Sequence, residues 1–151
     1  MFKTFFKKKN KAIDKDSIII DEKIFPLACL LVEAALADEK FGEDEKTIIV
    51  NILTKQFESK DVKYIDEIVN KALIAFNESS DLISHTRIIK EKWPLKQRIE
   101  VIEMLWKVCL VDGILEPYED MLIRRVSGLI YVDDKNRNIA KNNAISTLND
   151  E

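Results

Sequence analysis

Apolar residues recur at helical spacing along most of the chain, and no segment alternates with a period of two. The run from Leu27 to Leu36 is apolar nearly all round, which predicts a central buried helix from about Glu22 to Ala37. Proline is tolerated in the first turn of a helix, so Pro26 fits near the start of this one. Pro94 and Pro117 are expected to open two later helices. Further helices are predicted over about 43–57, from a cap at Ser59 to 77, from a cap at Ser80 to 93, and from Asp133 or Asp134 onward.

One stretch of the chain occurs twice. The pattern of Leu105–Ile123 repeats the pattern of Leu31–Ile49, which lies 74 positions earlier. Each copy contains an apolar helix that ends on Asp, a short loop, and a new helix with Glu in its first turn. The sequence therefore predicts an all-α bundle of about seven helices, built from two pseudo-repeated helical hairpins. The identical aligned residues are Leu31 and Leu105, Leu36 and Leu110, Asp38 and Asp112, Glu45 and Glu119, and Ile49 and Ile123.

The charge is spread unevenly along the 151 residues, whose net charge is −3. The first eleven residues hold five lysines and no acid, and the rest of the chain has 19 basic side chains against 27 acidic ones. This predicts a basic N-terminal segment and linker over 1–20 and one helical domain over 21–151. Because phosphate contacts need clustered Lys and Arg, the acidic domain makes nucleic acid an unexpected partner.

Two interpretations of residues 1–11 are open. Phe2, Phe5 and Phe6 would share one face of a helix surrounded by lysines, which can give weak peripheral contact with an anionic membrane surface. The alternative is a frayed, solubilising terminus. No apolar run approaches the ~18 residues of a membrane span, and the basic start lacks the apolar segment of a secretion signal. We therefore expect a cytoplasmic protein, with the inner membrane as its one candidate surface.

The two cysteines, Cys29 and Cys109, have no CxxC or zinc-ligand spacing. Both fall in apolar helical runs, where a free cysteine acts as a small hydrophobic residue. We expect both to be buried thiols, which fits a reducing compartment.

The repeated acidic turn is the candidate functional feature. Asp38 and Asp112 are expected at the C-terminal ends of their helices, where the helix dipole disfavours a carboxylate. An Asp side chain can instead accept hydrogen bonds from the amides of the following loop, and Gly113 can supply a left-handed turn residue. Glu45 and Glu119 fall three residues beyond their helix caps, which is the capping-box position.

A second interpretation of these four acids is a metal site. Asp and Glu seven residues apart, on either side of a loop, can bring two carboxylates to one cation. Loop carbonyls and water would complete an oxygen shell that suits Ca²⁺ or Mg²⁺, although the spacing is not that of an EF-hand. If the two halves pack about a pseudo-dyad, their turns can pool four carboxylates. A third interpretation is a surface that a protein partner recognises.

The segments Leu30–Glu45, Ser80–Arg87 and Ile102–Val132 resemble the TerB-like family, the tellurite-resistance protein B group, and in particular its stand-alone bacterial branch. The resemblance covers about Leu27 to Ala144. It implies an all-helical fold of two hairpin repeats, acidic residues proposed to bind metal, and a link to tellurite or general stress responses. It also implies protein partners, because related domains occur in membrane-linked stress complexes. The residues that match the acidic motif are Asp38, Glu45, Asp112 and Glu119.

An enzymatic function is not expected. The single histidine, His85, has no nucleophile and acid at a triad spacing, and three glycines do not form a phosphate-binding loop. Two functions remain: a divalent-metal-binding module of the TerB-like type, or a protein-interaction scaffold without metal. In the second function, the basic N-terminus can hold the scaffold at the inner membrane surface.

Overall fold

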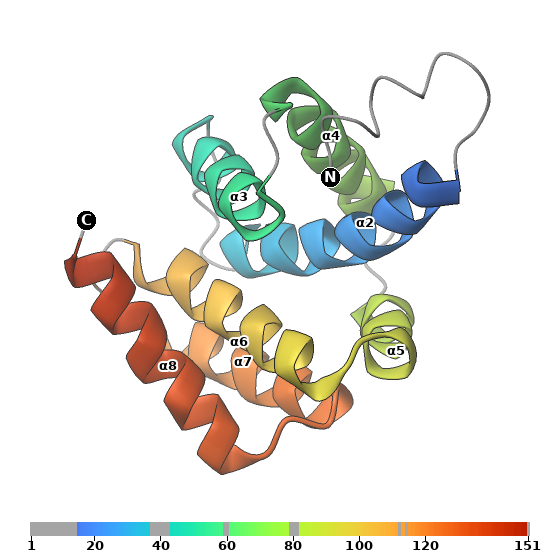
Figure 1. Ribbon diagram of the computed structural model, residues 1–151. Coiled ribbons are helices and arrows are strands. Elements are labelled where there is room, and N and C mark those ends of the chain that lie inside the picture. The colour runs from blue at the N-terminus through green and yellow to red at the C-terminus, as the bar shows by residue number, and fades with distance from the viewer. Residues whose placement is uncertain are drawn as a thin grey trace.

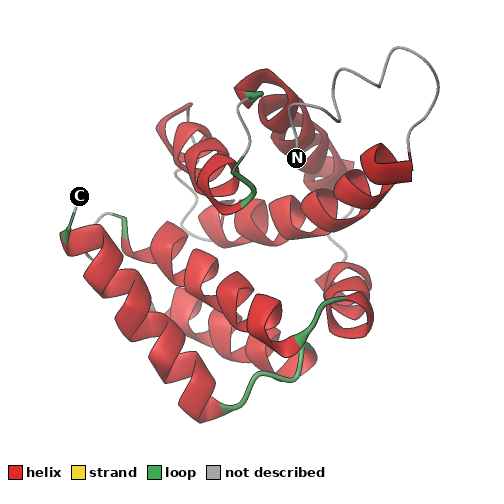
Figure 2. Cartoon of the chain, viewed as in Figure 1, coloured by secondary structure: helices red, strands yellow, loops and turns green. Residues whose placement is uncertain are grey.

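The computed structural model describes residues 15–36, 43–58, 61–78, 82–111, 113 and 115–150. These residues form helices and connecting turns, with no strand among them, which confirms the all-α prediction (Figure 2). The predicted basic segment 1–11 lies outside the described residues, and no described helix is long and apolar enough to cross a membrane. The helices are α2 Lys15–Leu36, α3 Glu43–Gln56, α4 Val62–Glu78, α5 Leu82–Lys92, α6 Leu95–Leu110, α7 Pro117–Leu129 and α8 Asp134–Asn149.

Helix α2 lies at the centre of the bundle. It packs against α3, α4, α5 and α6, so the other elements lie on several sides of it (Figure 1). The four consecutive residues from Leu27 to Leu30 point to different sides of this helix, and all four are buried. The apolar surface of α2 is therefore covered all round, as the sequence predicts for residues 27–36.

The two hairpins of the repeat are present. Helices α2 and α6 end at Leu36 and Leu110, while α3 and α7 begin at Glu43 and Pro117. Both pairs of boundaries differ by the 74 positions that separate the two sequence copies. The repeat therefore encodes the same helix boundaries in both halves. Helix α8 then packs along α6 and completes the second half (Figure 1).

The prediction for the start of α2 is wrong. The helix begins at Lys15 rather than Glu22, so part of the predicted linker 12–20 is helical and Pro26 lies inside the helix. An interior proline removes one backbone hydrogen bond and costs about 3 kcal/mol. Pro26 and its neighbours Ile24 and Leu27 are buried, so apolar packing offsets that cost. The local preference of proline for the first turn of a helix does not include this packing, so it predicts the wrong start for α2.

The structure describes the caps of α8 and α4. Asp133 caps α8, since its Oδ1 accepts a hydrogen bond from the Asn136 amide at 2.9 Å, as predicted. Helix α4 is capped by Asp61, whose Oδ1 accepts a hydrogen bond from the Tyr64 amide at 3.0 Å. Asp61 directly precedes Val62, the first residue of α4, and from this position its carboxylate reaches the third amide of the helix. The predicted caps Ser59 and Ser80 lie outside the described residues.

Arg98 joins the start of α6 to the end of α7. Its guanidinium donates to the carbonyl oxygens of Trp93 at 3.0 Å, Ile130 at 2.8 Å and Tyr131 at 3.2 Å. These carbonyls would otherwise lack a partner at the end of a helix, and a cation there also complements the helix dipole. Arg98 therefore fixes the position of the second hairpin against the α5–α6 junction.

We expect Arg98→Ala to destabilise the fold by about 2 kcal/mol, since hydrogen bonds from a charged donor are lost together. Arg98→Lys should recover only part of this, because an ammonium lacks the planar fork that reaches three carbonyls. Urea unfolding followed by circular dichroism measures the change. The control is Arg87→Ala on an exposed site of α5, which should change stability by less than ~0.5 kcal/mol. Equal effects at Arg87 and Arg98 would contradict the joining role of Arg98.

Glu58 ends the first hairpin in a strained conformation, with φ of 50°. A non-glycine residue in the left-handed region costs about 1–2 kcal/mol, and glycine avoids this at a smaller entropic cost. Glu58→Gly should therefore stabilise the protein by about 0.5–1 kcal/mol in thermal unfolding. Glu58→Gln removes the same charge but keeps the strain, so it should give no such gain. A stabilisation by Gln as large as that by Gly would assign the effect to charge.

Candidate functional site

The four predicted acids divide into two that the structure describes and two that it does not. Glu45 is the third residue of α3, and Glu119 is the third residue of α7. Asp38 and Asp112 lie outside the described residues. Helices α2 and α6 end at Leu36 and Leu110, two residues before each Asp, rather than on the Asp itself as expected.

Glu119 has the capping role that the sequence predicts. Its Oε1 accepts a hydrogen bond from the Glu116 amide at 3.1 Å, across the first turn of α7. Pro117 occupies the first helical position, where its missing N–H costs nothing. The Glu119 residue is only 5% exposed. A charged side chain that is so well buried is unusual and needs compensation from its surroundings.

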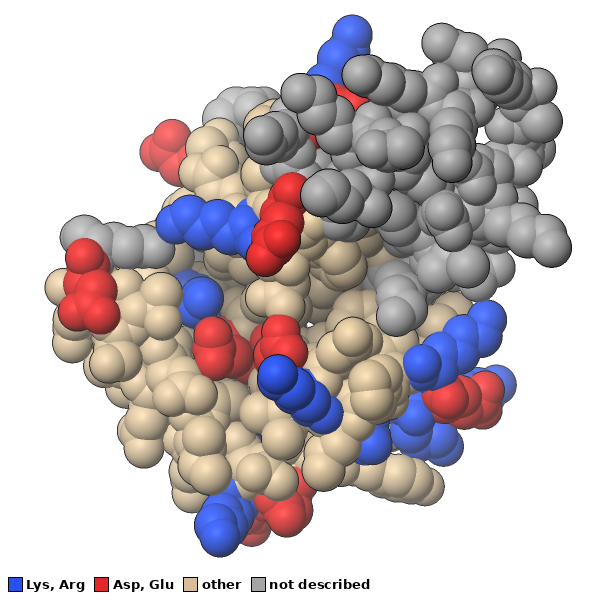
Figure 3. Space-filling view, in the orientation of Figure 1, with Lys and Arg blue, Asp and Glu red and all other residues tan. Residues whose placement is uncertain are grey.

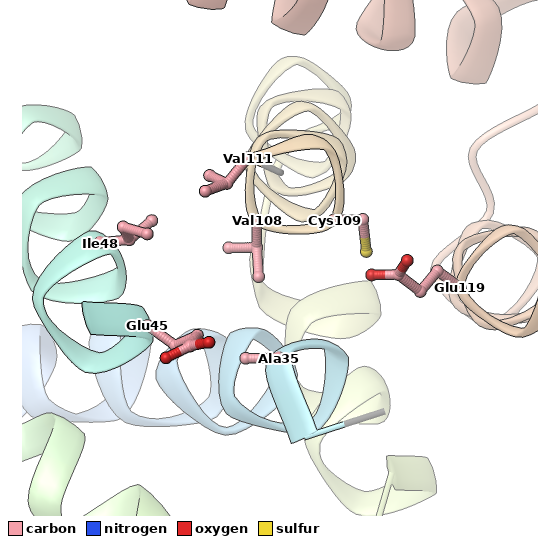
Figure 4. Close-up of a pocket in the computed structure, with 7 residues that line it drawn as sticks. All are labelled: Ala35, Glu45, Ile48, Val108, Cys109, Val111 and Glu119. Atoms are coloured by element: carbon pink, nitrogen blue, oxygen red, sulfur yellow. The ribbon is translucent and has the colours of Figure 1, made fainter. Parts of the chain in front are cut away.

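Glu119 and Glu45 line the same cavity. It lies among α2, α3, α6 and α7 and has a volume of about 60 Å³. Glu45 reaches into it from α3 and Glu119 from α7, on opposite sides, with Ala35 and Cys109 between them in this view (Figure 4). The two acidic helix starts, 74 positions apart in the sequence, therefore come together in space. A few water molecules, or a cation with part of its hydration shell, would fit this volume.

The turn after α6 has the predicted left-handed glycine. Gly113 has φ of +80°, and its amide donates to the Leu110 carbonyl at 2.9 Å. A side chain at this position would be strained, which explains the residue type. Leu115 is partly buried and packs against the core, so it anchors the loop as the sequence suggests. This turn carries the chain from the end of α6 to the first turn of α7, next to the cavity.

Both cysteines are buried, as expected, with exposures of 6% for Cys29 and 2% for Cys109. Burial, and secondarily the nearby Glu33 carboxylate, raises the pKa of Cys29 to about 12. Cys109 has a place that the sequence analysis did not anticipate, because it lines the cavity beside the Glu119 carboxylate (Figure 4). The sequence feature that could have indicated this place is the position of Cys109, three residues before Asp112 of the acidic turn.

Glu45 and Glu119 place two carboxylates at the cavity. Carboxylate oxygens are the ligands that Ca²⁺ and Mg²⁺ prefer. Within the described part of the chain, no group of three His, Cys, Asp or Glu side chains is placed to hold a metal ion. Glu45 and Glu119 thus supply two carboxylates, and any protein ligands beyond these would have to come from the undescribed residues of the two turns.

We expect both thiols to be inert in the native protein. Ellman's reagent at pH 8 should modify Cys29 and Cys109 far more slowly than in the unfolded chain, because the thiolate is the reacting form and both sulfurs are buried. As a control, Ser146→Cys on the exposed face of α8 should add one rapidly reacting thiol. Rapid modification of either natural cysteine under native conditions would contradict the packing described here.

The chain matches a known protein family. The family model described as tellurite resistance protein TerB matches residues 25–142. The matched range begins in α2 and ends in α8, so it includes both hairpins and the cavity between them. Comparisons with curated proteins and with solved structures give no match.

Proposed function

Because this chain belongs to the TerB family of tellurite resistance proteins, we propose that it is a non-enzymatic domain that binds one divalent cation at the cavity between its two hairpins. The family is associated with tellurite resistance and is not known as a family of enzymes. The resemblance noted in the sequence connects such domains with stress responses. The proposal assigns the cation to the repeated acidic turns.

The observation that carries the proposal is the convergence of Glu45 and Glu119 on one cavity (Figure 4). Two carboxylates that face one small space repel each other when both are ionised, and burial of Glu119 adds a desolvation cost. A divalent cation between them would offset both effects. Helix capping alone accounts for the Glu119 hydrogen bond, but it does not require that the two helix starts share a cavity.

The donor set selects the class of cation. In the proposed site, Glu45 and Glu119 each supply a carboxylate, and Asp38 and Asp112 supply further oxygens from the turns. An all-oxygen site favours Ca²⁺ or Mg²⁺ over metals that prefer nitrogen or sulfur. The cation would connect the start of α3 to the start of α7. Binding would therefore lock the two hairpins together without any chemical step.

A thermal melt with added cation tests this proposal. Starting in EDTA and adding Ca²⁺, Mg²⁺, Mn²⁺ and Zn²⁺ in turn, we expect one hard cation to raise the melting temperature. At a hundredfold excess over Kd the stabilisation is about 2.7 kcal/mol, or several degrees for a domain of this size. No shift with any cation would reject the metal site and leave the acids as caps and turn formers.

Glutamine variants separate the cation from the cap. Gln can replace Glu in a capping box, so Glu119→Gln should keep the cap and, because it removes the repulsion between the carboxylates, melt at or above the wild-type temperature in EDTA. It should nevertheless lose most of the cation-dependent shift, as should Glu45→Gln and the double variant Asp38→Asn with Asp112→Asn. Asp44→Asn and Asp120→Asn neutralise neighbouring acids that do not line the cavity, and they should retain the shift. If all these variants lose the shift equally, the cation stabilises the protein through its net charge and not by binding at this site.

A further inference from the structure

The outer side of α8 lacks charge over three turns. From residue 138 to residue 149, its exposed positions hold four asparagines, two isoleucines and one serine, and these exposed residues are called the neutral face below. The one charged residue of this span is Lys141, whose Nζ lies 5.0 Å from the ring centroid of Trp106, so its charge is directed toward α6. Figure 3 shows the largely uncharged surface over α8, with charged side chains near both ends of the helix.

The asparagines of the neutral face are not explained by the helix that carries them. Asparagine forms helices less readily than Lys or Glu, because its short amide competes for backbone hydrogen bonds. The exposed side of α4, by contrast, carries charged residues such as Lys63 and Glu67. Within the described part of the chain, the side chains of Asn138, Asn142 and Asn149 make no hydrogen bond. Their amides are therefore available to a group outside the chain.

The neutral face has the spacing of a helix-packing surface. Its central stripe, with steps of four, three and four residues, contains Asn138, Asn142, Ile145 and Asn149. One helix packs along another through residues at this spacing. Ile145 is 38% exposed, and Ile139 beside the stripe is 44% exposed, so a second helix would remove both from water. Each asparagine amide can both donate and accept a hydrogen bond, so the polar positions can pair with one another across such a contact.

The charges at the two ends of the neutral face select a second copy of this chain as the occupant. Lys135 is exposed seven residues before Asn142, and Asp150 is exposed eight residues after it. Neither side chain forms an ion pair within the described residues, whereas Asp134 pairs with Arg137 at 2.7 Å. Two antiparallel α8 helices that meet at Asn142 place each Lys135 beside Asp150 of the other copy. Parallel helices would instead bring like charges together.

The net charge of the chain favours the same arrangement. Each copy has a net charge of −3, so two copies repel each other unless their contact surface is neutral. In a twofold interface, a residue on the axis meets itself, which the uncharged amide of Asn142 allows without repulsion. Antiparallel packing also brings the C-terminal end of each α8, where the helix dipole is negative, next to Lys135 of the other copy.

We propose that the neutral face of α8 binds a second copy of this chain, to give a dimer with antiparallel α8 helices and a twofold axis at Asn142. The contact goes beyond cation binding and does not depend on it, because the cavity lies among α2, α3, α6 and α7. One helix packed on one helix gives a small interface, below ~1,200 Å² in total, so the dimer is weak. We expect a dissociation constant on the order of 10–100 µM.

Sedimentation equilibrium of the full chain in EDTA tests the dimer. From about 5 µM to about 500 µM, the chain should pass from monomer to dimer. Asn142→Glu places two like charges at the axis and should weaken dimerisation at least about tenfold, while Glu also favours the helix, so α8 stays folded. Asn77→Glu makes the same change at an exposed site of α4 and should leave dimerisation unchanged. A monomer at every concentration, or equal effects of the two variants, would overturn the proposal.

Engineered disulfides test the direction of the two helices. Asn142→Cys should form a disulfide between copies with oxidised glutathione, because the two copies of this residue meet at the axis. Asn138→Cys should not, because antiparallel packing separates its two copies by about 12 Å along the helix axis, beyond the reach of a disulfide. Equal crosslinking at both positions would indicate parallel helices, and no crosslinking at position 142 would exclude the proposed axis. Either result would overturn the proposal.

Discussion

The burial of α2 on all sides is the constraint on which the rest of the structure depends. A helix that is apolar all round cannot leave any face in water, so α3, α4, α5 and α6 must all pack against it (Figure 1). This packing is strong enough to keep Pro26 inside the helix. It also sets the position of α3 and α6 on either side of the cavity, because both are fixed to the same central helix. The proposed cation site is therefore a consequence of how the core is filled.

The two helix starts show how one residue can serve local structure and a site together. Glu119 caps α7 through one oxygen, and its carboxylate also lines the cavity that Glu45 reaches from α3 (Figure 4). The cap holds the carboxylate in place before any ligand arrives, which reduces the conformational entropy that binding has to overcome. In the proposed function, each hairpin of the repeat therefore contributes one preorganised carboxylate to the cation site.

The sequence predicts those features that depend on local pattern. Helical spacing, the repeat of Asp38 and Glu45 in Asp112 and Glu119, and the turn glycine at Gly113 led to the fold class, the two hairpins and the capping role of Glu119. The local pattern of the sequence does not predict features that depend on packing between distant segments. The early start of α2, the three carbonyls held by Arg98, and the meeting of Glu45, Glu119 and Cys109 at one cavity all join segments that are distant in the chain.

The most direct measurement is a crystal structure grown with Mn²⁺, which replaces Mg²⁺ or Ca²⁺ at oxygen sites and scatters anomalously. We expect a single anomalous peak in the cavity between α3 and α7, within coordination distance of carboxylate oxygens from both Glu45 and Glu119. That result would establish that the two hairpins share one cation. A clear map with no peak in the cavity, or with manganese only on exposed carboxylates elsewhere, would show that the two hairpins do not share a cation.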